Sequence, residues 1–350
     1  MSADVSSSRP RANNGEPAAG LVDWHSHMLS DRLTPRPSAV GAWPGIRSRA
    51  GVYELTLAGD LYRQIDERTF RAEQRLSDMD EMGVAVQVLS PPPYVVGFAG
   101  PPAETASLAA QQNEFLAGVV AREPTRFAML AMLPYGDASA VEAEIGRLAG
   151  YQGVLGVCVT AFRDDHLCDP AHEQLWRQLA EAGLLAFVHP ADTHIPECEL
   201  STGSVFGAGM PLATARTAAR MIASGLLAAV PDLQVLLAHA GGALPSTIDR
   251  LAQGWRLGQL PALAESPVSY ARRSFWADNL AYAAAPLQLA ALTFGVERIV
   301  YGSDYPFAAA QSPQQLDALD PAAGLVDQAR ATGSRLLDRT LERRGVGGSS

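Results

Sequence analysis

The sequence contains few cysteines and no long apolar run. Its three cysteines, Cys158, Cys168 and Cys198, form no CxxC pair and no disulfide framework, which is typical of a protein in a reducing cytoplasm. No apolar run approaches the roughly 20 residues that a helix needs to cross a bilayer, so no membrane partner is expected. Residues 1–20 lack the apolar stretch of a signal peptide, and we expect a disordered leader followed by one domain, residues 21–345.

Positive charge is also scarce. The 350 residues carry a formal net charge of −10, which argues against nucleic acid or an anionic membrane as the main partner. No GxGxxG sequence follows the first predicted strand, so a dinucleotide-binding fold has no support. The hydrophobic fraction of 47% allows an ordinary core, and the length suits one α/β barrel domain.

Short apolar runs alternate with helix-like segments through most of the chain. Such alternation indicates a parallel sheet that is covered on both faces, and eight units favour a closed (β/α)8 TIM barrel over an open doubly wound sheet. The predicted strands are residues 21–27, 84–89, 127–133, 153–160, 184–189, 235–239, 274–280 and 298–301. The predicted helices between and after them are residues 104–122, 139–148, 171–182, 212–229, 244–253, 286–294 and 313–344.

Two connections are much longer than the others, and we expect insertions after the first and fifth strands. Residues 28–68 are rich in Pro, Gly and Arg and contain one β-like piece, Val52–Leu57, while residues 190–209 form the second long loop. Loops of this length inside a domain are usually functional. After the first insertion, Thr69 is expected to cap a helix that ends at Gly83.

Histidines and a carboxylate stand at the ends of several predicted strands. His25 and His27 end the first strand, where alternate side chains face the same way. His189 ends the fifth strand, His239 the sixth, and Asp304 follows the eighth. Barrel enzymes build their active sites from these strand ends, so the five side chains are expected to meet. The other histidines, His166, His172 and His194, lie in loops or on helices.

This set of side chains has the chemistry of a metal site. Three imidazoles and one carboxylate suit Zn²⁺ or a similar divalent ion and leave room for a water molecule. Such an ion lowers the pKa of the water and polarises a bound carbonyl or carboxylate. The carboxylate at the last strand end could bind the metal, transfer a proton, or both, and the remaining histidine would serve as a general acid or base.

Four motifs together resemble the amidohydrolase superfamily, and more narrowly its aminocarboxymuconate-semialdehyde decarboxylase branch. The likeness extends over roughly residues 21–340 and includes the segment Arg75–Val84 and the pair Arg126-Phe127. The motifs are specific as a set and weak singly. They are His25-x-His27, Phe187-Val188-His189-Pro190, the run from Ala238 to Pro245, and Tyr301-Gly302-Ser303-Asp304-Tyr305-Pro306-Phe307.

The resemblance implies a role for each matching residue. The metal ligands would be His25, His27, His189 and Asp304, and His239 would act on the metal-bound water. Arg63, in the segment Gly59–Arg63, would hold the substrate carboxylate. Arg250 would reach the site of a second copy across the interface of a homodimer. Arginine suits this task because its planar guanidinium binds a carboxylate with two parallel hydrogen bonds.

The sequence also departs from the family pattern. Ala191 stands where the decarboxylases usually carry a Trp, which reshapes the pocket and makes the family's own substrate doubtful. The family's first Gly after the histidine is Ala240 here. The fourth strand ends at Val159-Thr160, without a Lys or Glu to bridge two metals, so a single ion is favoured. The loop beside His189 could nevertheless supply a second ion and redox chemistry through Asp192, His194, Glu197 and Glu199.

The leading hypothesis is a metal-dependent, oxygen-independent decarboxylase of an unsaturated or aromatic carboxylic acid. Its cofactor would be one divalent ion, with Zn²⁺ first and Mn²⁺ or Fe²⁺ next, and its catalytic residues His239 and Asp304. The alternative is a metal-dependent hydrolase or hydratase that acts on a carbonyl, lactone or alkene. A non-enzymatic barrel and a two-iron oxygenase remain as further alternatives.

Overall fold

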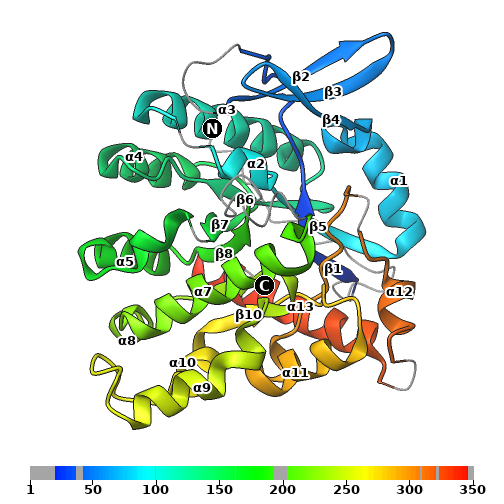
Figure 1. Ribbon diagram of the computed structural model, residues 1–350. Coiled ribbons are helices and arrows are strands. Elements are labelled where there is room, and N and C mark those ends of the chain that lie inside the picture. Colours follow the sequence, from blue (N-terminus) through cyan, green and yellow to red (C-terminus); the bar gives the residue numbers. More distant parts are fainter. Residues whose placement is uncertain are drawn as a thin grey trace.

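A computed structural model of the chain describes residues 20–36, 42–98, 100–161, 163–191, 203–307, 310–320 and 323–345. Seven parallel strands form the main sheet, in which each strand pairs with the next one along the chain. The sheet is curled and helices surround it (Figure 1). The strands are β1 (Leu21–His27), β5 (Val84–Ser90), β6 (Phe127–Met132), β7 (Val154–Ala161), β8 (Leu185–Pro190), β9 (Val235–Leu237) and β10 (Phe275–Ala277).

The segment predicted as the eighth strand, Arg298–Tyr301, joins the two edges of this sheet. It is not a regular strand, because a 3-10 turn occupies the residues up to Arg298 and only isolated bridges follow. Ile299 bridges to Ala277 of β10, and the main-chain NH of Trp24 in β1 donates to the carbonyl of Tyr301 at 2.8 Å. The residues after this segment therefore lie beside the carboxyl end of β1.

Helices cover the outside of the sheet, mostly where the sequence predicts them. They are α1 (Ala72–Met82), α2 (Pro93–Val96), α3 (Pro102–Arg122), α4 (Ala138–Leu148), α5 (Glu173–Glu181), α7 (Met210–Ala223), α8 (Leu226–Ala229), α9 (Leu244–Arg256), α10 (Pro267–Ser274), α11 (Ala284–Phe294), α12 (Pro313–Asp317) and α13 (Leu325–Arg343). In the described part of the chain no helix is both long and apolar enough to span a membrane.

Four local predictions need correction. The helix expected over residues 313–344 is two helices, α12 and α13. Gly83 ends α1 in a left-handed conformation as predicted, but Thr69 is not its cap, because it belongs to a separate 3-10 turn. The single helix expected over residues 212–229 is two helices, since Gly225 has a φ of 85° between them. The strand expected over residues 274–280 keeps only residues 275–277, because α10 includes Ser274 and the strand ends before Asp278, whose carboxylate accepts from the NH of Leu280.

The first insertion is a small antiparallel sheet. Its strands are β2 (Pro44–Arg49), β3 (Val52–Leu57) and β4 (Asp60–Ile65), so the β-like piece predicted at Val52–Leu57 is confirmed as the central strand. Figure 1 shows this sheet beyond one end of the main sheet. Leu55 of this sheet and Trp43 just before it join a buried cluster with Tyr94 and Phe98, which fixes the insertion to the rest of the domain. The second insertion lies largely outside the described residues.

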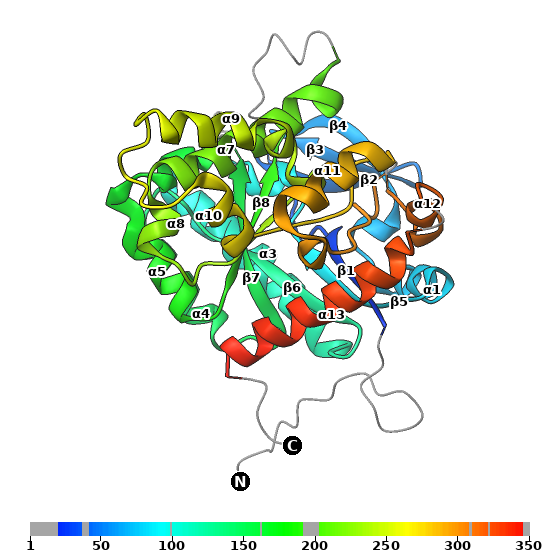
Figure 2. The same cartoon turned by 90° about the horizontal axis from the view of Figure 1, so that it is seen from below.

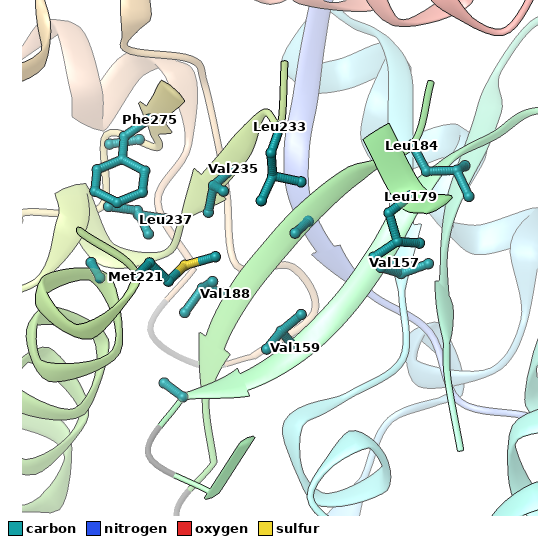
Figure 3. Packing of buried hydrophobic residues seen from close by; sticks show 14 of the residues in the cluster. Val157, Val159, Leu179, Leu184, Val188, Met221, Leu233, Val235, Leu237 and Phe275 are labelled. Carbon is teal, nitrogen blue, oxygen red and sulfur yellow. The ribbon is translucent and has the colours of Figure 1, made fainter. Parts of the chain in front are cut away.

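Two apolar layers hold the sheet. The outer layer packs the strands against the helices, as for Val157 and Val188 with Leu179 and Met221 (Figure 3). The inner layer fills the space inside the curl with side chains such as Trp24 and Phe187. Helix α13 contacts β1, and Figure 2 shows it in red across the lower part of the molecule. This packing makes the strand ends a rigid base for the polar side chains above them.

Candidate metal centre

Four buried side chains meet at the carboxyl ends of the strands. They are His25 and His27 of β1, His189 of β8, and Asp304 in the segment that joins the sheet edges. One nitrogen or oxygen atom of each lies within 4.8 Å of the others. Nε2 of His25 is 3.1 Å from Nε2 of His27 and 3.0 Å from Nε2 of His189. The strand ends thus bring together the four residues expected to converge.

The three histidines present lone pairs to one another. Each ring has an oxygen acceptor for its Nδ1 hydrogen, so its Nε2 atom carries the lone pair. Lone pairs that face each other at this distance repel unless a cation lies between them. The Nδ1 acceptors are Asp278 Oδ2 for His25 at 2.6 Å, the Pro190 carbonyl for His189 at 2.6 Å, and Ser90 Oγ for His27 at 2.9 Å.

Asp304 adds a negative charge to the cluster. Its Oδ1 atom is 3.2 Å from Nε2 of His27 and 3.4 Å from Nε2 of His25, and within the described part of the chain it has no hydrogen-bond partner of good geometry. The backbone of Asp304 has a left-handed φ of 63°, and its NH donates to the carbonyl of His25 at 2.8 Å. Such conformations are uncommon for residues other than glycine and gather at functional sites.

The cluster fits one divalent ion. An ion with bonds of about 2.1 Å holds neighbouring ligand atoms about 3.0 Å apart in octahedral geometry and about 3.4 Å apart in tetrahedral geometry. The spacings of 3.0 and 3.1 Å between nitrogens and of 3.2 and 3.4 Å to the carboxylate fall in this range. Three imidazoles and one carboxylate suit zinc, manganese or iron.

Electrostatics favour the metal-binding protonation states of His27, His189 and Asp304, but not that of His25. Burial lowers the pKa of His27 and of His189, because a charged ring is disfavoured away from water. Burial alone would raise the pKa of Asp304, but its contact with His27 and the nearby charges hold that pKa below its usual value. Burial would also lower the pKa of His25, but the hydrogen bond with Asp278 and the negative charges of the nearby carboxylates together outweigh burial, and the pKa is raised.

His239 stands beside the cluster without being part of it. It begins a 3-10 turn after β9 with a φ of 57°, and its ring lies 5.4 Å from that of His25 and 5.2 Å from that of His189. Its Nδ1 atom is buried and has no hydrogen-bond partner among the described residues, and burial lowers its pKa. A neutral imidazole at this position can accept or donate a proton next to the four converging atoms.

The sequence analysis missed Asp278. This fully buried carboxylate follows β10, accepts a hydrogen bond from His25, and also accepts one from the main-chain NH of His239 at 2.9 Å. It therefore fixes the orientation of both histidines, as the acceptor behind a metal-binding imidazole commonly does. Its position after the seventh apolar run could have identified Asp278 as a strand-end residue. Because the predicted strand was extended to Leu280, Asp278 was counted as part of that strand.

The sequence model of the amidohydrolase family matches residues 22–337. The chain belongs to the amidohydrolase family. The 2-amino-3-carboxymuconate-6-semialdehyde decarboxylase of Dictyostelium discoideum is 25% identical over 306 residues, which are 82% of this chain and 81% of that protein. The gamma-resorcylate decarboxylase of Rhizobium radiobacter is 27% identical over 271 residues, which are 71% of this chain and 81% of that protein.

A solved amidohydrolase-type decarboxylase has a similar fold. The dihydroxybenzoic acid decarboxylase of Polaromonas sp. JS666, determined with bound manganese and the inhibitor 2-nitroresorcinol, superposes with a TM-score of 0.72. It is 21% identical to this chain, and the match covers 92% of this chain and 97% of that one. The resemblance predicted from the motifs is confirmed, and the relatives support the predicted enzyme class, a carboxy-lyase of the amidohydrolase family.

A buried polar network ties together two of the three segments that carry the cluster residues of this amidohydrolase, namely β1 and the segment with Asp304. Asp23, on β1, accepts hydrogen bonds from the Ser303 hydroxyl at 2.6 Å and from the Gln87 amide at 3.0 Å. Gln87 in turn accepts from the guanidinium of Arg75 at 2.9 Å, which also donates to the carbonyl of His27 at 2.6 Å. Arg75 is fully buried, and desolvation lowers its pKa to about 10.

We expect Ser303→Ala to destabilise the metal-free protein by about 2 kcal/mol, because the buried Asp23 carboxylate loses a charge-assisted hydrogen bond. Urea unfolding followed by circular dichroism measures this loss. The matched control is Ser139→Ala, which removes a serine–aspartate hydrogen bond of 2.7 Å on the exposed surface and should leave stability unchanged. Equal effects of the two substitutions would contradict a special role of the buried network.

The two arginines expected to bind substrate lie at different distances from the cluster. Arg63 of β4 donates to the Tyr62 hydroxyl at 2.8 Å, and its Cζ atom lies 5.9 Å from the ring centre of Phe307. The ring of Phe307 is 5.1 Å from that of His27, so Arg63 is at the rim of the site. Arg250 lies exposed on α9, in a separate hollow whose lining includes none of the cluster residues.

The departures from the family pattern have mixed outcomes. Ala191 is buried directly after β8, and Thr160 pairs in register with His189, where its buried hydroxyl has no partner. The loop with Asp192, His194, Glu197 and Glu199 lies outside the described residues, so the second-ion alternative stays a hypothesis. The other histidines, His166 and His172, contact each other at a ring distance of 5.5 Å and are not in the cluster.

Proposed function

We propose that this chain is a metal-dependent, oxygen-independent decarboxylase of a small aromatic or unsaturated carboxylic acid. The observation that carries the proposal is the convergence of three histidine Nε2 atoms and the Asp304 carboxylate beside His239. The decarboxylase names of the relatives support it from a second direction. The substrate would be a small carboxylate. It need not be a substrate of the relatives, since Ala191 reshapes the pocket.

The ligands of the ion would be His25, His27, His189 and Asp304. When bound, a divalent ion polarises the substrate oxygens that it contacts and lowers the pKa of a bound water. Zinc is our first assignment, because the donor set suits it. Manganese is the next, because a structural neighbour contains it, and iron remains an alternative.

The side chains of the protein would divide the remaining work. Arg63 would hold the substrate carboxylate at the rim, and Asp278 would keep His25 and His239 in place. As the bond between the carboxylate and its carbon breaks, the electron pair stays on that carbon and carbon dioxide leaves. His239 would deliver the proton that takes its place, and Asp304 would assist the proton transfer. In total, the reaction consumes one carboxylate group and one proton, and it forms one carbon dioxide and one C–H bond.

Incubation of the metal-loaded protein with a series of small aromatic acids tests this proposal. We expect release of one carbon dioxide per product molecule, at the same rate with and without oxygen. Activity on a neutral ester or lactone without release of carbon dioxide would instead favour the hydrolase or hydratase alternative, and consumption of oxygen would favour the two-iron oxygenase.

The assembly and fold belong to the same proposal. We propose a cytoplasmic homodimer of a single barrel domain over residues 21–345, with the segment after residue 298 as the eighth member of a (β/α)8 barrel. The long insertions would follow the first and fifth strands. The hydrogen bonds that join both sheet edges support the closed barrel.

We expect Arg63→Ala to raise KM for carboxylate substrates about tenfold, which is the low end for a charge-assisted contact because the side chain is exposed. Steady-state kinetics measures the change, with kcat expected to stay within a few fold. Arg49→Ala, which removes an exposed arginine from the same small sheet, is the control. A silent Arg63→Ala together with a preference for neutral substrates would count against the decarboxylase proposal.

Arg250 allows a test of the shared active site. If Arg250 serves the site of the other copy, mixing Arg250→Ala chains with His239→Ala chains should restore part of the activity, because one site of the heterodimer regains both residues. The two-fold interface of a homodimer permits this exchange. Full activity of a monomer in solution would remove the shared-site proposal.

A further inference from the structure

A cavity of about 280 Å³ opens beside His239. Its walls come from the turn before α7, from the start of α9 and from the segment after β10. Among the described residues that line it, none is Asp, Glu, Lys or Arg, and His239 is the one titratable side chain apart from a tyrosine. Most of the wall is apolar, formed by side chains such as Phe206, Pro211, Leu280, Tyr282, Pro286 and Leu289.

Tyr282 has an unusual backbone at this cavity. Its φ is 56°, in the left-handed region that bulky residues seldom adopt and that is found mostly where function requires it. The centre of its ring lies 5.8 Å from the ring centre of Phe206, which comes just before α7 in the chain. Burial, followed by the negative charges of Asp304 and Asp278, raises the pKa of Tyr282, so its phenol is neutral.

The side of the site that is formed by the small antiparallel sheet is cationic. There the guanidinium of Arg63 lies 4.5 Å from the ring centre of Tyr62 and near Phe307, which contacts His27. The site therefore has a cationic side on the small antiparallel sheet and an uncharged, apolar side behind His239. A substrate with a charge at one end and an apolar group at the other matches this arrangement.

We infer that the cavity beside His239 binds the uncharged apolar part of an aromatic monocarboxylate, with Phe206 and Tyr282 as specificity-determining residues. This inference rests on the proposed function for the carboxylate end of the substrate. It excludes acids with a second carboxylate at the far end, because a charge moved into this cavity would lose its water without gaining an Arg or Lys partner among the described lining residues.

Calorimetric titration of the metal-loaded protein with three acids tests the inference. We expect 4-ethylbenzoate to bind about tenfold more tightly than benzoate, because the cavity buries two further carbon groups. Benzene-1,4-dicarboxylate, with a charge in the place of the ethyl group, should bind more weakly than benzoate. In Phe206→Ser and in Leu289→Ser, the gain from the ethyl group, taken as the ratio of the two affinities within each variant, should fall to about threefold or less.

The control is Leu212→Ser. Leu212 and Phe206 have the same exposed fraction, 53%, but Leu212 does not line the cavity, so its substitution should keep the full gain. The inference is overturned if the ethyl group gives the same gain in Phe206→Ser as in the wild type. It is also overturned if the wild type binds the dicarboxylate best or binds none of the acids, or if Phe206→Ser changes only the oligomeric state.

These measurements separate the inference from the proposed function. Binding that depends on Phe206, without carbon dioxide release from any acid, would refute the decarboxylase and keep the pocket assignment. Carbon dioxide release with no dependence on Phe206 would keep the decarboxylase and refute the pocket assignment.

Discussion

Replacing both His25 and His27 by alanine is expected to lower the affinity for the divalent ion by more than about 100-fold. This loss exceeds the usual fall in metal affinity when only a residue that hydrogen-bonds to a ligand is replaced. Both Nε2 atoms belong to the converging set, and Asp304 and His189 alone would leave a two-ligand site. Decarboxylation should disappear with the ion. Elemental analysis after dialysis measures the content of metal per chain, and titration with Zn²⁺ or Mn²⁺ measures the affinity.

A double histidine substitution elsewhere makes the control. His166 and His172 pack against each other outside the cluster, so His166→Ala combined with His172→Ala should keep about one ion per chain. Unchanged metal content in the His25→Ala, His27→Ala protein would refute the site. Two ions per wild-type chain would refute only the single-ion assignment, and would turn attention to the loop with His194.

Asp304→Asn provides a milder check of the same site, because the amide keeps the size of the side chain and loses its charge. The buried Oδ1 atom of Asp304 has no hydrogen-bond partner of good geometry, so the carboxylate is poised to meet a cation. Weaker metal binding with an intact fold would support its role as a ligand.

The second large effect is expected at His239. We expect His239→Ala to lower kcat by about 10²–10⁴-fold, the usual contribution of a general acid or base. Metal content and substrate affinity should change little, because the ring stands 5.2 and 5.4 Å from two cluster rings and is not among the converging ligands. Steady-state kinetics and elemental analysis on one preparation separate the two properties.

His172→Asn serves as the control for exchange of a histidine outside the site, and its kcat should equal that of the wild type. If His239→Ala loses the metal together with its activity, His239 is a ligand and the division of roles proposed above is wrong. If it keeps full kcat, the proton must come from another group, for which Asp304 is the candidate.

Much of the site follows from local rules of sequence. Strand residues alternate between two faces, so His25 and His27 must point together when their segment is extended. Parallel strands end at one edge of a sheet, so His189 and His239 meet them once the alternation of strands and helices is recognised. These are short-range properties of the chain. They suffice for the α/β class, for the convergence of His25, His27, His189 and Asp304, and for the place of His239 beside them.

Only the tertiary structure decided what surrounds these residues. Asp278 accepts from a histidine 253 positions earlier, and Asp23 accepts from Ser303, 280 positions later. No periodicity connects residues so far apart, and a buried arginine such as Arg75 looks like any surface charge until its partners are in place. The same holds for the break in the eighth strand and for the small sheet after β1. The sequence by itself therefore determined which side chains reach the strand ends, because that depends on local backbone geometry. Tertiary packing decided their orientation, their charge and the shape of the cavity beside them, because hydrogen bonds and burial join distant segments.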